Sequence, residues 1–207
     1  MKTLYLIILV AFTGITGCEK DDTKKSEPAG WSLAGDFPQE YKIGVETQDA
    51  QHGEKSGYIE SVADTAHGFG TLCQWFNGEA YRGNRVRMTG YIQSLADETS
   101  VSSMWARVDD YGRQVTADFD NMMDRPLTGT NYWTKCVIVF DVPDSPCIIY
   151  YGVILQGTGK TWFDNLTFEI VDSTVIKTAV NMNEPFWEYF EMPEHAPKDP
   201  VNLDFEQ

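Results

Sequence analysis

Short runs of alternating apolar and polar residues fill the chain between residues 31 and 172, and Gly, Asn, Asp and Pro separate them. A period of two is typical of strands with one buried face, and no run shows the longer period of an amphipathic helix. The pattern therefore predicts an all-β jelly-roll β-sandwich with strands at 41–46, 57–62, 70–76, 84–94, 102–109, 113–119, 133–142, 147–155 and 161–171.

The last 35 residues differ from this pattern. Residues 173–200 are acidic and contain four prolines, which break helices, so we expect a tail that wraps around the sandwich. Residues 201–207 return to alternation, with Leu203 and Phe205 as the apolar positions. They are predicted to form a final strand that completes the sandwich.

The first residues of the chain resemble the export signal of bacterial lipoproteins. Lys2 precedes an apolar run that is too short to span a bilayer, and 15–18 (Ile-Thr-Gly-Cys) is similar to a lipobox. This resemblance implies a signal peptide at 1–17 and acylation of Cys18. Two or three acyl chains on Cys18 would hold the protein firmly in the membrane. The alternative is an ordinary signal peptide with a chance cysteine.

A polar tether follows at residues 18–30, too hydrophilic to fold alone. Its 19–22 segment (Glu-Lys-Asp-Asp) resembles the signal that sends lipoproteins of the Bacteroidetes to the outer face of the outer membrane. We therefore expect an outer membrane lipoprotein, exposed at the cell surface and attached to the membrane through its lipid only. The alternative for 19–22 is a solvated spacer.

Composition narrows the class of partner. A net charge of −15 repels phosphate backbones, so nucleic acid is excluded as a partner, while 42% hydrophobic residues suffice for a sizeable core.

Beyond Cys18, the odd number of cysteines leaves at least one unpaired. We expect Cys73, Cys136 and Cys147 to be small buried apolar groups, because no spacing suggests zinc.

No enzymatic motif emerges, and the chain is predicted not to be an enzyme. Asp109, Asp110, Asp118 and Asp120 are near one another in sequence, but acids near turns are usually only solvated. The segment 157–161 (Gly-Thr-Gly-Lys-Thr) lacks the first glycine of a phosphate-binding loop, so a hairpin turn is the favoured interpretation.

One strand offers a ligand face. Alternation at 104–109 places Trp105, Arg107 and Asp109 on one side of the sheet, which joins an aromatic ring, a guanidinium and a carboxylate. Sugars need these contacts, since their C–H patches stack on rings and their hydroxyls pair with donors and acceptors. The equally favoured alternative is a buried ion pair under a packing tryptophan. Further amide contacts are expected from Gln74, Asn121 and Gln156, with Trp75 on the opposite side from Gln74.

Three segments resemble carbohydrate-binding modules of the galactose-binding-like jelly-roll type. These are 52–58, which resembles the His-x-Gly-x-x-Ser segment before a strand, 162–168, similar to the last strand, and 202–206, similar to the first strand. Because that first strand here closes the chain, the resemblance implies a permuted order. Segments within 68–130 also resemble an accessory module found beside helix-turn-helix regulators.

The resemblance implies a glycan or oligosaccharide as partner and a structural Ca²⁺. In related modules the ion binds a Glu of the first strand, an Asp of the last strand and loop carbonyls, which correspond here to Glu206, Asp164 and the 49–55 loop. The alternative is two unrelated surface acids. For the whole chain, the alternative to non-catalytic glycan binding is a structural or protein-interaction lipoprotein without a small-molecule site.

Replacement of Cys18 tests the anchor. Cys18→Ser removes the thiol that must accept the diacylglycerol, so the variant should leave the membrane fraction or accumulate as uncut precursor. Membrane fractionation and labelling with a radioactive fatty acid measure both effects. Equal acyl labelling of the variant and the wild type would contradict lipidation at Cys18.

Overall fold

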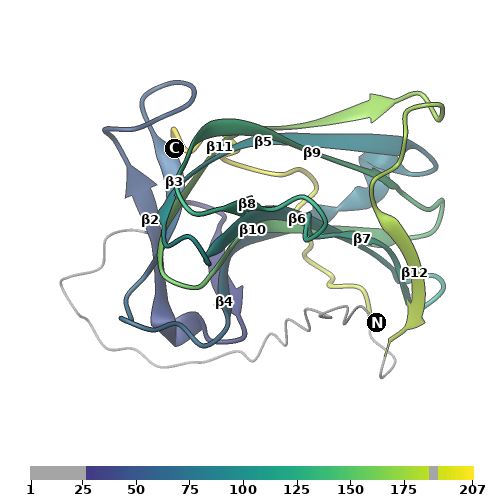
Figure 1. The fold of residues 1–207 in the computed structure, drawn as a ribbon. Coiled ribbons are helices and arrows are strands. Elements are labelled where there is room, and N and C mark those ends of the chain that lie inside the picture. Colours follow the sequence, from purple (N-terminus) through teal and green to yellow (C-terminus); the bar gives the residue numbers. More distant parts are fainter. Residues whose placement is uncertain (1–26, 187–190) are drawn as a thin grey trace.

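The computed structural model describes residues 27–186 and 191–207; the predicted signal peptide and the lipidation site at Cys18 lie outside these residues. Two antiparallel sheets pack face to face (Figure 1). Within the described residues, no helix is long and apolar enough to cross a membrane. The predicted all-β sandwich is confirmed.

Sheet A has the strand order β1-β4-β10-β6-β7-β12, with β8 beside β6, and sheet B has the order β2-β3-β11-β5-β9. The strands of sheet A are β1 (Ser32–Gly35), β4 (Phe69–Asn77), β6 (Val101–Asp110), β7 (Val115–Asp120), β8 (Leu127–Thr128), β10 (Cys147–Gln156) and β12 (Val180–Pro185). Those of sheet B are β2 (Tyr41–Glu46), β3 (Ser56–Ser61), β5 (Arg85–Ala96), β9 (Asn131–Asp141) and β11 (Gly159–Val171). Two 3₁₀ turns, Pro38–Glu40 and Gly78–Tyr81, complete the elements.

Each of the nine strands expected between residues 31 and 172 is present, with small differences at the ends. The prediction missed β1, β8 and β12. The first two have four and two residues, which is too short for a periodic signal, and β12 has polar side chains at half of its positions. Sequence alternation needs a buried face, and β12 has none, since five of its six residues are exposed.

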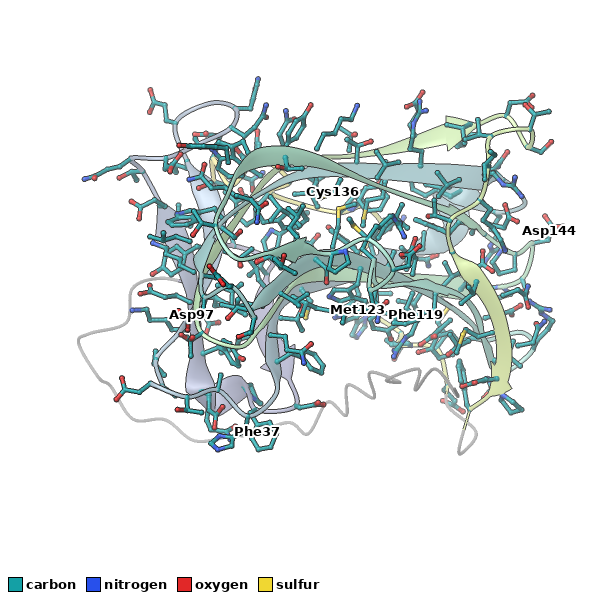
Figure 2. The ribbon with its side chains drawn as sticks, in the orientation of Figure 1. Phe37, Asp97, Phe119, Met123, Cys136 and Asp144 are labelled. Atoms are coloured by element: carbon teal, nitrogen blue, oxygen red, sulfur yellow. The ribbon has the colours of Figure 1, made fainter. Side chains whose placement is uncertain are left out.

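The core fills the space between the sheets. Strands of both sheets contribute to it, with Leu72, Phe76, Met104, Val108, Ile149, Tyr151 and Val153 from sheet A and Ile59, Met88, Ile92, Ile138, Phe140 and Phe163 from sheet B. Cys136 lies in this layer (Figure 2). Cys73, Cys136 and Cys147 are free and buried as expected, and burial raises the pKa of Cys136 to about 11.

The tail leaves the sandwich after β11 and returns to it. Its Lys177 ammonium lies 2.9 Å from the Asp118 carboxylate, and Thr178 Oγ1 donates to Asp120 at 2.5 Å. β12 then pairs with β7 at the edge of sheet A. The predicted wrapping tail therefore includes a strand.

Residues 201–207 pack back on the sandwich as predicted, but they form turns and not a strand. Phe205 is fully buried and stacks on Trp31 with ring centroids 5.0 Å apart. The indole Nε1 of Trp31 donates to the Asn202 carbonyl at 3.1 Å, and the Gln74 side chain bonds both the N–H and the carbonyl of Val201. Side chains therefore satisfy backbone groups that a strand would pair with a neighbour. The strand prediction was wrong because Asn202 and Phe205 adopt positive φ.

Removal of this segment should destabilise the fold. Phe205→Ala leaves a cavity beside Trp31 and is expected to cost about 3–5 kcal/mol, whereas Ile176→Ala, at a side chain that is 84% exposed, should change stability by about 0.5 kcal/mol or less. Truncation after Pro200 should cost at least as much as Phe205→Ala. Chemical denaturation measures all three; an unchanged transition in the truncated chain would contradict the packing role.

Candidate functional site

The outer face of sheet A, which points away from sheet B, carries a second group of aromatic residues. Figure 2 shows Phe119 and Met123 on the lower side of this sheet, opposite to Cys136. The apolar members Phe69, Cys73, Trp105 and Ile154 form a cluster separate from the core. Ala34, Phe119 and Tyr150 pack against it.

Four side chains form a row across this face. Trp75 on β4, Tyr150 on β10, Arg107 on β6 and Phe119 on β7 are direct partners in the register of neighbouring strands. Partners in register lie on the same face, with strands about 4.8 Å apart, so the row extends across about 14 Å. All four side chains are half-buried. We call these residues the aromatic row.

Members of the row contact one another. The Trp75 and Tyr150 rings lie with centroids 6.3 Å apart, and the Arg107 guanidinium lies 4.7 Å from the Tyr150 centroid. Tyr150 also shares a hydrogen bond with the Tyr111 hydroxyl at 3.3 Å. Burial is the main cause that raises the pKa of Tyr150, so its hydroxyl stays protonated and can donate.

Arg107 and Asp109 form an ion pair, with Nη2 2.9 Å from Oδ2. Thr116 Oγ1 donates to the other oxygen of Asp109 at 3.0 Å. Burial raises the pKa of Asp109, and the nearby guanidinium opposes this shift. The pair thus presents a fixed donor beside a fixed acceptor.

Trp105 lies on the same face as Arg107 and Asp109, as alternation predicted, but it is not available for stacking. Its side chain is only 1% exposed, and its Nε1 donates to Thr71 Oγ1 at 2.8 Å. It packs in the apolar cluster with Phe69 and Ile154. The expectation of Trp105 as an exposed sugar platform is corrected to that of a packing residue, the alternative considered from the sequence.

The three predicted amide residues do not join the row. Gln74 points to the other side of β4, where its Oε1 accepts from the Tyr151 hydroxyl at 2.8 Å. Gln156 is exposed at the far end of β10, paired in register with Val101 and Phe69. Asn121 follows β7, and its side chain accepts from the Met123 N–H at 3.2 Å.

Sequence reasoning missed Trp75, Tyr150 and Phe119. Alternation along each strand puts the side chains of all three on the outer face of sheet A. From the sequence, Trp75 was placed on the opposite side of its strand from Gln74, but was not assigned to a site. What the sequence does not provide is the register that aligns four strands, since β4 and β7 are separated from each other by two intervening strands in the sheet. Aromatic residues in matching phase on several strands are the signal that could have found them.

The four acids considered for glycoside hydrolysis are all buried and all bound to basic side chains. Asp109 binds Arg107, Asp110 binds Arg113, Asp118 binds Lys177 and Asp120 binds Arg125. A hydrolase needs two carboxyl groups that face one cleft and the substrate. These ion pairs instead hold each carboxylate to the scaffold.

The structure brings Asp164, Glu206 and the 49–55 loop together, as the calcium prediction required. Asp164 Oδ2 accepts from the backbone N–H groups of Gln51 and His52 at 2.8 and 2.9 Å. Glu206 Oε1 accepts from those of Glu54 and Lys55 at 2.6 and 2.8 Å. The loop thus turns N–H donors, and not carbonyl oxygens, toward these oxygen atoms.

The oxygen atoms of Asp164 and Glu206 that face the loop accept hydrogen bonds from it. A calcium ion needs six to eight oxygen ligands, whereas Asp164 Oδ2 and Glu206 Oε1 each already accept two backbone N–H groups. In the described residues, no group of three or more His, Cys, Asp and Glu side chains could hold a metal ion. Calcium binding at this loop stays a prediction.

No family model matches the sequence. The chain is 34% identical over 194 residues to the uncharacterized HTH-type transcriptional regulator YbfP of Bacillus subtilis, a match that covers 93% of this chain but 61% of that protein. This agrees with the resemblance to a module found beside helix-turn-helix regulators. Because the chain spans only 61% of this relative, the activity of the whole regulator does not transfer to it.

Solved structures show the same fold at low identity. The xylan-binding CBM22-1 domain of Paenibacillus barcinonensis Xyn10C superposes with a TM-score of 0.50 and 14% identity over 72% of this chain and 92% of that domain. The enzymatically active domain of bacteriophage CBA120 tailspike protein 4 gives a TM-score of 0.55 and 10% identity, covering 70% of this chain and 20% of that one. Structures with this fold therefore include a binding module and an enzyme, and the jelly-roll β-sandwich of carbohydrate-binding modules is confirmed as the fold.

The Asp164 site predicts a pH dependence. Burial raises the pKa of Asp164 to about 6, so the folded state binds a proton more tightly than the unfolded state. Stability from this group is therefore greatest below about pH 4 and falls as the pH rises toward 6. Asp164→Asn should lose this slope, and Glu169→Gln, at an exposed acid of sheet B, should keep it.

Calcium would change that slope. A bound cation lowers the pKa of Asp164, and it raises the melting temperature in proportion to the logarithm of its excess over the dissociation constant. Thermal denaturation of chelator-treated protein with added Ca²⁺, from pH 4 to 7, measures both. An equal melting temperature at every Ca²⁺ concentration would remove the calcium prediction.

Proposed function

We propose that this protein is a non-catalytic glycan-binding module and that the aromatic row on sheet A is its binding site. The observation that carries the proposal is the alignment of Trp75, Tyr150, Arg107 and Phe119 on one face. Three rings and a guanidinium, all partly accessible, follow one line across four strands. An extended sugar chain has the shape to lie along such a line.

The chemistry of the row suits a sugar. Pyranose rings have apolar C–H faces that pack on Trp75 and Tyr150, while their hydroxyls need donors and acceptors together. Arg107 donates, Asp109 accepts, and the hydrogen-bonded Tyr111 and Tyr150 hydroxyls do both. The site thus offers each type of contact within one row.

Two comparisons support the proposal without establishing it. The xylan-binding domain of Xyn10C has the same fold and a similar extent. The similarity to a protein named as a transcriptional regulator suits a module that recognises a small ligand and is used in different chains. The absence of catalysis is proposed because all four candidate acids are engaged in ion pairs.

We propose that the module lies outside the cytoplasmic membrane. The lipobox at 15–18 and the polar tether suggest a lipid-anchored protein of the outer membrane, with the sandwich exposed to surface or periplasmic glycans. The tether and the lipid would then supply the attachment, and the sandwich would supply the recognition.

A structural or protein-interaction role is the second candidate, and a specific observation favours it. Trp105 is buried and Arg107 is paired with Asp109, so part of the outer face of sheet A is filled by its own side chains. Exposed apolar side chains such as Tyr132, 91% exposed, and Ile176 would serve a protein partner. Under this role, no glycan would bind.

A glycan array with the mature chain distinguishes the two roles. Trp75→Ala and Arg107→Ala should weaken binding of any glycan found by about tenfold or more, because each removes a contact of roughly 1.4 kcal/mol. Tyr132→Ala is the matched control on an exposed ring outside the row and should bind normally.

Trp105→Ala completes the series. Because its ring is buried, this variant should lower the melting temperature, as core truncations do. A wild-type chain that binds no glycan, or binding that survives the Trp75 and Arg107 substitutions, would contradict the proposed site.

A further inference from the structure

We propose that the site selects uncharged glycans and that Asp109 is the residue that excludes acidic ones. The inference rests on the proposed function, since it concerns the ligand class of the same face. It comes from the Arg107–Asp109 ion pair, and not from the aromatic rings of the row.

Arg107 is the only charged member of the row, and its charge is already balanced. Its side chain is 15% exposed, and Nη2 lies 2.9 Å from the Asp109 carboxylate. Asp109 is fixed in turn by Thr116 and is itself only 7% exposed. The pair cannot easily open, because a freed carboxylate would stay buried without a partner.

A neutral sugar fits this pair better than an acidic sugar does. One hydroxyl can accept from Arg107 while its neighbour donates to Asp109, so no charge is left unpaired. A sugar carboxylate that reaches Arg107 must come close to the Asp109 carboxylate, and the repulsion offsets the attraction. The net charge of −15 opposes an anionic chain even before contact.

Sheet B offers a matched control for this charge. Arg87 on β5 and Glu169 on β11 form an ion pair of 2.7 Å on the outer face of the opposite sheet. Glu169→Gln frees an arginine there, as Asp109→Asn frees Arg107 in the row. Both variants change the net charge by the same amount. A difference in their affinity for acidic sugars therefore reports where the freed arginine lies.

The test compares neutral and acidic chains of the same backbone. The probes are gluco- and galacto-oligosaccharides of four units, and the same chains oxidised at C6 to uronic acids. Wild-type protein should bind a neutral probe at least about tenfold more tightly than its oxidised form. Asp109→Asn should gain about tenfold in affinity for the oxidised form, whereas Glu169→Gln should gain nothing.

A double variant assigns the gain to Arg107. In Arg107→Gln/Asp109→Asn both charges are absent, so the gain in affinity for oxidised probes should be lost. Retention of the gain in this double variant would overturn the role of the ion pair. The comparison of probes on wild-type protein needs no variant, so it holds even if Asp109→Asn proves unstable.

The failures are distinguishable. If wild-type protein binds oxidised chains as well as neutral ones, and Trp75→Ala still removes binding, the selectivity is overturned while the glycan site stands. If wild-type protein binds none of the probes and no array glycan, the proposed function fails and the selectivity fails with it.

Discussion

The register of β10 between β4 and β6 determines both sides of sheet A. It places Tyr151 and Val153 in the core and, on the alternate positions, Tyr150 between Trp75 and Arg107. A shift by one residue would turn the core residues outward and the row inward. Since β10 is central and paired along its length on both sides, the burial of its apolar residues fixes the geometry of the candidate site.

The ion pairs of the sandwich follow from the same packing. Acids on β6 and β7 are buried at the positions where the sheet meets its turns and its tail, and each has a basic partner. A buried carboxylate without such a partner would be costly. The large excess of acids in the sequence therefore resides mainly at the surface, and the buried ones are used to hold β7, the tail and the row in place.

The sequence was sufficient to predict the fold, because strands with one buried face leave a period of two that can be read locally. β5 shows this clearly, because every second residue from Val86 to Ser94 is buried. The C-terminal segment was predicted to return but not in its actual form, since side chains of Trp31 and Gln74, far away in sequence, supply its hydrogen bonds. Alternation identified the face of Trp105, but not its burial, and it could not align Trp75 with Phe119 across intervening strands.

The contact between Trp31 and residues 201–207 has a mechanical consequence. Force applied to the chain on the N-terminal side of residue 29 would load the sandwich first at Ala29 and Trp31, next to the edge strand β1 and then β4, which carries Trp75. Trp31 is held by the Phe205 ring and the Asn202 carbonyl, so the other end of the chain clamps the point where the force enters. Because residues 29–31 are fastened to residues 202–205, tension must shear these contacts before it can peel β1 from the sheet.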